Sequence, residues 1–196
     1  MLSSGTTYKQ AGVNIEASER FTLMIKERVG KAWPGTAKEI GGFAGGGPIP
    51  ARRRRIKAST DGAGTKALLA AMTGRLEGIG IDAVAMSAVD TYVSGARPAY
   101  LLDDLNVGHL IPDVHIAIID GIIKGCIQSG CRLLGGETAE QSDMFRYSWM
   151  FSLSTFVIGF PDPMLRQTRI RPGQTVWGWP SRGPGSNGFS LIRKSL

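Results

Sequence analysis

The chain has 196 residues, of which 42% are hydrophobic, and carries a formal net charge of +7. This length suits one large domain, or one domain with part of another. No apolar window is long enough to cross a bilayer, and the polar N-terminus does not resemble a signal peptide. Two cysteines are too few for a disulfide framework. We therefore expect a cytoplasmic protein with no membrane partner.

Part of the positive charge comes from four adjacent arginines at positions 52–55, followed by Lys57. Such a run can mark a nucleic-acid site, but recognition usually needs a wider basic face, often with aromatic side chains for stacking. No aromatic residue is interleaved here. We interpret the run as a solvated loop before a strand and expect no nucleic-acid partner.

The first part of the chain combines helical patterns with one short strand. Residues 1–15 are polar and are interpreted as an extended arm. Apolar residues at helical spacing predict a helix over residues 16–31, and a short strand is predicted over 55–59. The apolar helical pattern that follows has one side formed by Leu68, Leu69 and Met72.

The rest of the chain continues this alternation. Helices are predicted over residues 79–95 and from Pro112, the second with a buried stripe of Val114, Ile118, Ile122 and Cys126. Strands are predicted over 99–107, 131–134, 149–160 and 174–179, and a last helix over 189–196. Strands that alternate with helices indicate a layered α/β or α+β domain.

Residues 58–66, Ala-Ser-Thr-Asp-Gly-Ala-Gly-Thr-Lys, lie between a predicted strand and a predicted helix. Gly62 and Gly64 let the backbone turn tightly and approach a ligand. Backbone N–H groups beside a helix N-terminus favour a phosphate, Lys66 adds positive charge, and Asp61 could hold Mg²⁺. An ordinary strand-to-helix turn, with Lys66 in solvent, explains these nine residues equally well.

Two other glycine-rich segments, at residues 41–48 and 135–140, could also lie against a ligand. Residues 41–48 cannot form regular structure, and either lie against a ligand or form a surface loop. Residues 135–140 place Glu137 in a Gly-Gly loop after a strand. Carboxylates gathered around a nucleotide are what Mg²⁺ requires, and Asp61, Asp90 and Glu137 could supply them. Alternatively, Asp90 is a polar helix position and Glu137 a turn residue.

Several motifs, in order along the chain, resemble those of aminoimidazole ribonucleotide synthetase, the phosphoribosylformylglycinamidine cyclo-ligase family. They are Tyr-Lys-x-Ala-Gly-Val-x-Ile at 8–15, Gly-Gly-Phe-x-Gly-Gly at 41–46, Thr-Asp-Gly-x-Gly-Thr-Lys at 60–66, Gly-Ile-Asp-x-Val-Ala-Met at 80–86, Ser-Gly-Cys-x-Leu-x-Gly-Gly-Glu-Thr-Ala-Glu at 129–140 and Ser-Asn-Gly-Phe-Ser-Leu at 186–191.

The resemblance implies an ATP- and Mg²⁺-dependent ring closure in purine biosynthesis, acting on formylglycinamidine ribonucleotide. It implies catalytic roles for Lys9 and Lys66, and substrate contacts from Ser186, Asn187 and Gly188. Metal ligands would be Asp61, Asp90 and Glu137. The nucleotide would be held by Gly42, Gly45, Asp61, Gly62, Gly64, Thr65, Lys66, Gly136, Glu137 and Thr138.

The resemblance also implies an α+β fold, with a small mixed sheet covered by helices on one face. Residues 1–162 would form an ATP-binding and dimerisation domain, and residues 163–196 the truncated start of a second, substrate-side α+β domain. In the family, two sheets join across a dimer into a barrel. An exposed edge on the apolar strand at 149–160 would favour the same homodimer.

The sequence departs from the family at three places. Val89 stands where the family has Asn, Gly185 where it has His, and residues 141–143 replace Met-Pro-Gly. We expect this chain alone to bind ATP–Mg²⁺ weakly and not to close the ring. The alternatives are a degenerate non-catalytic nucleotide-binding relative, and another ATP-dependent kinase or synthetase of the same superfamily.

Overall fold

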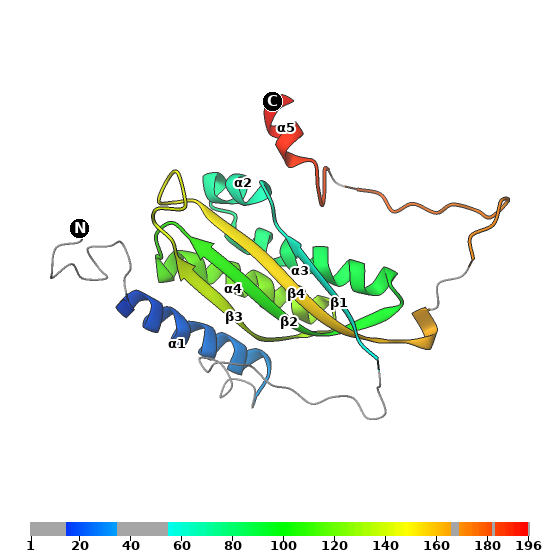
Figure 1. Cartoon of the computed structure of the whole chain (residues 1–196), viewed down its shortest axis with the longest axis horizontal. Helices are drawn as coiled ribbons and strands as arrows, with labels where there is room; N and C mark the ends of the chain where they lie inside the picture. The colour runs from blue at the N-terminus through cyan, green and yellow to red at the C-terminus, as the bar shows by residue number, and fades with distance from the viewer. Residues whose placement is uncertain (1–14, 35–54, 166–168, 182, 196) are drawn as a thin grey trace, which may run out of the picture.

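The structure, a computed structural model, describes residues 15–34, 55–165, 169–181 and 183–195 (Figure 1). Its elements are α1 (Ile15–Ala32), β1 (Lys57–Gly62), α2 (Lys66–Thr73), α3 (Leu76–Val93), β2 (Ala96–Val107), α4 (Pro112–Gln128), β3 (Arg132–Glu140), β4 (Phe151–Pro161), a 3₁₀ turn (Pro163–Leu165) and α5 (Phe189–Ser195). Within these ranges, no helix has the length and apolar character needed to cross a membrane.

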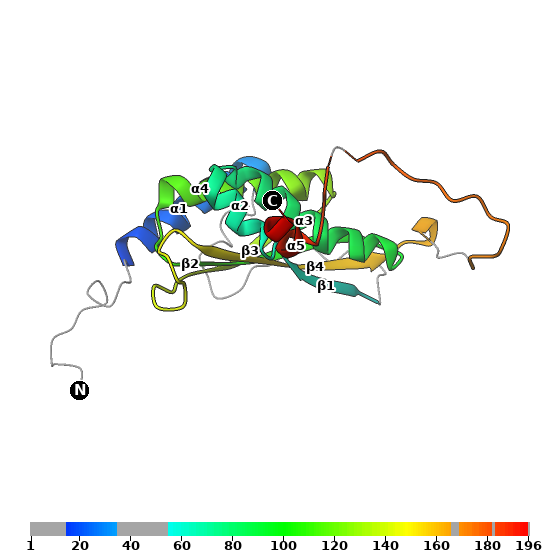
Figure 2. The same ribbon diagram turned by 90° about the horizontal axis from the view of Figure 1, so that it is seen from above.

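Four strands form one mixed sheet in the order β1-β4-β2-β3. β4 is antiparallel to both β1 and β2, whereas β3 is parallel to β2 and is reached through α4. Figure 2 shows the helices gathered on one side of the sheet. The predicted α+β class, with a small mixed sheet and helices on one face, is therefore confirmed.

The core lies between the sheet and the layer formed by α3 and α4. Strand residues alternate between the two faces, and in β4 the side chains of Phe151, Leu153 and Val157 are buried against the helices. None of the described helices covers the opposite face. Its neighbouring side chains Leu102 and Phe156 are 37% and 38% exposed, so a hydrophobic strip crosses the open face.

The two central helices approach each other through glycine. A Cβ atom at Gly80 of α3 would lie 2.2 Å from the carbonyl oxygen of Ile118, and one at Gly121 of α4 would lie 2.0 Å from that of Glu77. Side chains essentially never approach a backbone so closely, so alanine at either position would force the helices apart.

The end of α4 brings the two cysteines together. The Cys131 N–H donates to the Cys126 carbonyl oxygen over 2.9 Å, and Gly130, at φ 65°, provides the left-handed turn. This is the Schellman pattern, in which the residues at its two ends make an apolar contact. Both cysteines are buried and free, as expected from the sequence.

The predicted C-terminal ends of the strands that precede the two glycine motifs are wrong. β1 runs to Gly62 and therefore includes Asp61, and β3 runs through Gly135 and Gly136 to Glu140. Each segment pairs with a neighbouring strand along its length, and these backbone hydrogen bonds outweigh the weak strand preference of glycine.

Three other local predictions also differ from the structure. Residues 174–179 do not form a strand, and Trp177 and Trp179 there are 90% and 98% exposed. α2 buries Lys66, Ala67 and Ala70, whereas Met72 from the predicted apolar side is exposed. Likewise, Val114 is exposed although the other members of its predicted stripe are buried.

The expected exposed edge on the strand at 149–160 is also wrong. β4 spans Phe151–Pro161 and pairs with β1 on one side and β2 on the other. The sheet edges are β1 and β3. The uncovered part of β4 is therefore one face of the strand, which carries Phe156.

Asp103 is an unusual member of the core. It points toward the helices from the centre of β2, and its Oδ1 atom occupies the space where a Cβ atom of Gly136 would lie. Burial, with smaller contributions from the charges of Asp104 and Glu137, raises the pKa of Asp103 to about 7, although its own backbone N–H opposes the shift.

We predict that Asp103→Asn changes the pH dependence of stability. A carboxyl group whose pKa is raised on folding destabilises the native state as pH rises from the unfolded-state pKa, about 4, to the folded-state pKa. Relative to the wild type, the variant should gain roughly 3–4 kcal/mol between pH 4 and pH 8, measured by urea unfolding. Asp104→Asn, on the exposed face of β2, is the control; an equal gain there would contradict the assignment.

Candidate functional site

The candidate site lies where β1 ends and α2 begins. The Asp61 carboxylate accepts a hydrogen bond from the Gly62 N–H over 2.7 Å, and the Ala63 N–H donates to the Leu153 carbonyl oxygen over 2.8 Å. Gly64 has φ +58° with open space around its Cβ position. This turn leaves backbone on its outer side accessible, as an anion-binding turn requires.

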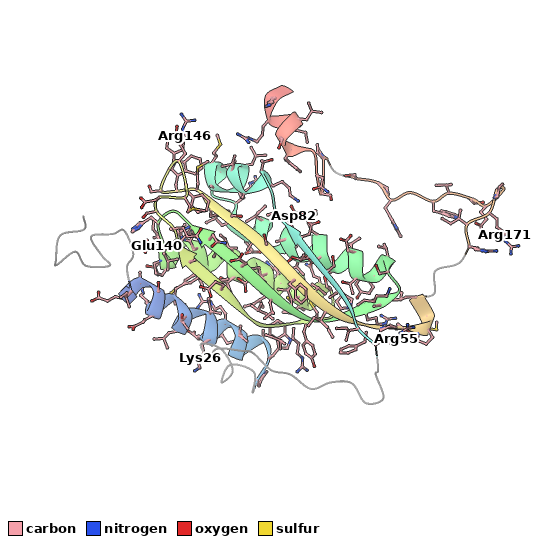
Figure 3. The ribbon with its side chains drawn as sticks, in the orientation of Figure 1. Lys26, Arg55, Asp82, Glu140, Arg146 and Arg171 are labelled. Carbon is pink, nitrogen blue, oxygen red and sulfur yellow. The ribbon has the colours of Figure 1, made fainter. Side chains whose placement is uncertain are left out.

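Lys66 is the first residue of α2, and its side chain is buried. The residue is only 6% exposed, and its Nζ atom forms an ion pair with Asp82 of α3. The ammonium makes no well-aligned hydrogen bond in the described structure, so Asp82 is its main polar partner. Figure 3 shows Asp82 near the C-terminal end of β1, where the chain enters α2.

The other side of the Lys66 ammonium faces α5. Its Nζ atom lies 5.6 Å from the centre of the Phe189 ring, a cation–π distance. The adjacent residue, Ser190, shares a 3.1 Å hydrogen bond with the Thr65 hydroxyl group. The N-terminal turn of α5 therefore lies against two consecutive residues of the predicted phosphate loop.

The predicted substrate loop, Ser186–Gly188, lies in the same neighbourhood. The Ser186 hydroxyl group donates to the Met86 sulfur over 3.2 Å, and Met86 is one helical turn from Asp82 on α3. Ser186 itself has φ 59°, a left-handed conformation that is uncommon for residues other than glycine. The structure thus brings the predicted phosphate and substrate loops together, although 120 residues separate them (66 to 186).

The three predicted metal ligands occupy different places. Asp61 lies on the helix-covered face of β1, because it pairs with the helix-facing Thr155. Asp90 of α3 accepts a hydrogen bond from Ser59 over 3.1 Å, on the same side of the sheet. Glu137 pairs with Asp104 on the open face of β3, at the opposite edge of the sheet.

Within the part of the chain that the structure describes, no three His, Cys, Asp or Glu side chains are grouped closely enough to hold a metal ion. The set of Asp61, Asp90 and Glu137 therefore does not fit a single Mg²⁺ site within one chain. Asp61 and Asp90 are the two members that share a face.

The remaining predicted nucleotide residues are distributed between two regions. Gly136 and Thr138 lie with Glu137 on β3, which is separated from β1 by the two strands β4 and β2. Figure 3 shows Glu140, at the end of this strand, well apart from Asp82. Lys9, Gly42 and Gly45 lie outside the described residues, so their predicted roles stay predictions.

Glu140 belongs to a separate polar cluster at the start of α4. Its side chain, 1% exposed, accepts hydrogen bonds from the Leu110 N–H over 2.8 Å and lies 2.7 Å from His109 Nδ1. The nearby His115 accepts the Ile111 N–H over 3.0 Å, and burial lowers its pKa. These contacts fix the backbone that enters α4, so we assign the cluster a structural role.

Sequence reasoning missed the roles of Asp82 and Phe189. Asp82 was visible as an acidic residue on a predicted helix, but no spacing rule links it to Lys66. The one signal was Lys66 itself, since a lysine within an apolar helix start needs a counter-charge if it is buried. Phe189 and Asp82 both lie within the family motifs at 186–191 and 80–86, but neither motif by itself indicates a contact with Lys66.

Comparison with known proteins identifies the family. The profile of the family described as AIR synthase related protein, N-terminal domain, matches residues 49–160. The chain belongs to this family.

Curated relatives agree with this assignment. The phosphoribosylformylglycinamidine cyclo-ligase of Magnetococcus marinus is 40% identical across 97% of this chain and 56% of that protein. The chloroplastic/mitochondrial cyclo-ligase of Vigna unguiculata is 42% identical across 99% of this chain and 48% of that protein. The chain thus spans about half the length of the curated relatives it matches.

Solved structures show the same fold. Hydrogenase maturation protein HypE, crystallised in complex with ATP, superposes with a TM-score of 0.60 at 20% identity, over 83% of this chain and 46% of that one. HypE from E. coli gives 0.57 at 19% identity, over 77% of this chain and 45% of that one.

We predict that Asp82→Asn destabilises the protein more than loss of an ordinary surface ion pair does. Removing one partner of a fully buried pair costs about 3–5 kcal/mol, and because Asp82 is partly exposed we expect about 1–3 kcal/mol here. The control is Glu77→Gln. Glu77 lies on α3, as Asp82 does, and forms an exposed ion pair with Lys124 of α4. Loss of this pair should cost ~0.5 kcal/mol or less. Equal losses in urea unfolding would show that Asp82 does not compensate a buried charge.

Proposed function

We propose that the protein is an ATP-dependent cyclo-ligase of purine biosynthesis. It would close formylglycinamidine ribonucleotide to aminoimidazole ribonucleotide, with release of ADP and phosphate. The observation that carries the proposal is the 40% identity to relatives of this name over nearly the whole chain. The free cysteines Cys126 and Cys131 are in keeping with a reducing cytoplasm, where we place the protein.

The geometry around Lys66 supports phosphoryl transfer chemistry. In the proposed reaction, the formyl oxygen of the substrate accepts a phosphoryl group from ATP. An amidine nitrogen of the substrate then attacks the formyl carbon, and the phosphorylated oxygen leaves as phosphate. A fixed positive charge in a largely buried position stabilises a phosphoryl group more strongly than one in water. Lys66 supplies such a charge, and Gly64 in the adjoining turn is exposed, with open space around its Cβ position.

Substrate positioning is assigned to the loop at Ser186–Gly188. This loop reaches α3 through the contact between Ser186 and Met86. A ligand held there would lie near the phosphate loop, and positioning of two reactants contributes strongly to ring closure.

Mg²⁺ would neutralise phosphate charge when bound. Asp61 and Asp90 offer the carboxylate oxygens that it prefers, and both lie on the helix-covered side of the sheet. Glu137 lies on the other face of the sheet and at its other edge, so within one chain it could not join a site formed by Asp61 and Asp90. We therefore derive no reaction step from the metal.

Two substitutions support a non-catalytic, nucleotide-binding relative as the second candidate. Val89 is 55% exposed beside Asp90, where the family has an amide. Gly185 has open space around its Cβ position, so among the described residues no side chain takes the place of the family's histidine.

An ATP-dependent cyclisation assay on the intact gene product separates the two candidates. Under the leading proposal, Lys66→Met lowers kcat/KM by about 10²-fold or more, because it removes a charge aimed at the phosphoryl group. Lys124→Met, which removes an exposed lysine, is the matched control and should leave the rate unchanged. Nucleotide binding without ring closure in the wild type would instead favour the non-catalytic relative.

We also propose that two copies pair through the open faces of their sheets. The support is the hydrophobic strip formed by Leu102 and Phe156, which neighbour each other across β2 and β4. Exposed apolar patches on a sheet face favour association. Family architecture implies the same arrangement.

Phe156→Arg should convert the dimer into monomers, because it places a charge within the hydrophobic strip. Sedimentation velocity at micromolar concentration measures the change. Val114→Arg, at a similarly exposed apolar position on the helical side, should leave the dimer intact. A monomeric wild type, or a Phe156→Arg variant that still forms dimers, would contradict the proposal.

A further inference from the structure

Two consecutive residues of α5 lie against two consecutive residues of the phosphate loop. Phe189 covers the ammonium of Lys66, and the Ser190 hydroxyl group bonds to that of Thr65. We call residues 189–194, which carry both contacts, the strap. Figure 1 shows that the strap follows a long connection and returns to the end of the sheet where α2 begins.

Both contacts occupy groups that a phosphate would use. Thr65 is the N-cap residue of α2, yet its side chain makes no capping hydrogen bond to the helix. Its hydroxyl group is instead engaged by Ser190. Lys66, 94% buried between Asp82 and Phe189, presents little of its ammonium to solvent. An incoming phosphate therefore has to displace at least one neighbour.

The relative strengths of these contacts decide which neighbour leaves. A cation–π contact at a partly exposed ring is weaker than the ion pair that compensates a buried ammonium. Apart from that ring contact, the strap contact to the phosphate loop described above is one hydroxyl–hydroxyl bond between Ser190 and Thr65. Asp82 should therefore stay in place while the strap is released.

The geometry points to an autoinhibitory contact: the strap covers Thr65 and Lys66, and a polyphosphate that binds here must take the face of Lys66 that Phe189 covers. The inference rests on the proposed function in one respect, the choice of a polyphosphate as ligand. Because the strap and the ligand compete for the same groups, each must weaken the binding of the other.

The first test is calorimetric titration of the 196-residue chain with sodium tripolyphosphate, in the wild type and in Phe189→Ala. Removing the ring should tighten binding about 2- to 10-fold, since a closed fraction lowers the apparent affinity. Leu191→Ala, at an exposed position of the same helix, is the matched control and should bind as the wild type does. Weaker or unchanged binding in Phe189→Ala, or no binding by any variant, overturns the inference.

The second test needs no ligand and so remains informative if the variant binds poorly. Acetylation by an N-hydroxysuccinimide ester, followed by peptide mass spectrometry, reports how accessible Lys66 is relative to Lys57, which is exposed in β1. Phe189→Ala should raise the Lys66 rate several-fold and leave the Lys57 rate unchanged. An unchanged Lys66 rate overturns the proposed cover.

The third test follows hydrogen exchange of residues 189–194 in the wild type as tripolyphosphate is added. Release of the strap predicts faster exchange, and slower exchange would show that the ligand closes it instead. None of the three measurements involves ring closure. A protein that fails the cyclisation assay but shows these responses refutes the cyclo-ligase proposal and leaves the strap supported.

Discussion

The close packing of α3 against α4 is the constraint on which the rest of the domain depends. Gly80 and Gly121 bring each helix to the backbone of the other, so both fit within one layer above a sheet of four strands. α4 packs against β3, and α3 is held against β1, β4 and β2. That placement brings Asp82 to Lys66 and Met86 to Ser186, while Asp90, two turns beyond Asp82 on α3, meets Ser59 of β1.

The sequence predicted the long amphipathic elements well, because their burial pattern is a property of each segment alone. The helices around residues 16–31, 79–95 and 112–128 and the strand near 149–160 all form within a few residues of the expected bounds. Predictions failed where a partner decides the structure. Gly135 and Gly136 extend as a strand because β2 lies beside them, while residues 174–179, with a strand-like composition, have no pairing strand and stay irregular.

The site shows the same division. Family motifs indicated the right loops, and Thr65, Lys66 and Ser186 do meet. The separation of Asp61 from Glu137 was not predictable from the sequence. The order of the strands, and the face of the sheet to which each side chain points, depend on how all four strands pair. β1 and β3 are the two edges of the sheet, and the two carboxylates point to opposite faces. Asp82 was missed for a related reason: whether a lysine is buried depends on a helix sixteen residues away (66 to 82) and on a strap more than a hundred residues away.

The strand order also governs how the chain can fold as it is synthesised. Of the four strands of this sheet, β4 is the last to leave the ribosome, yet it lies between β1 and β2. Until residue 161 has emerged, β1 has no partner and β2 keeps one unpaired edge, although β2, α4 and β3 can already form a local parallel unit. Unpaired edges are templates for association with other chains. Translation that pauses or terminates between β3 and β4 would therefore release the species of this protein most prone to aggregate.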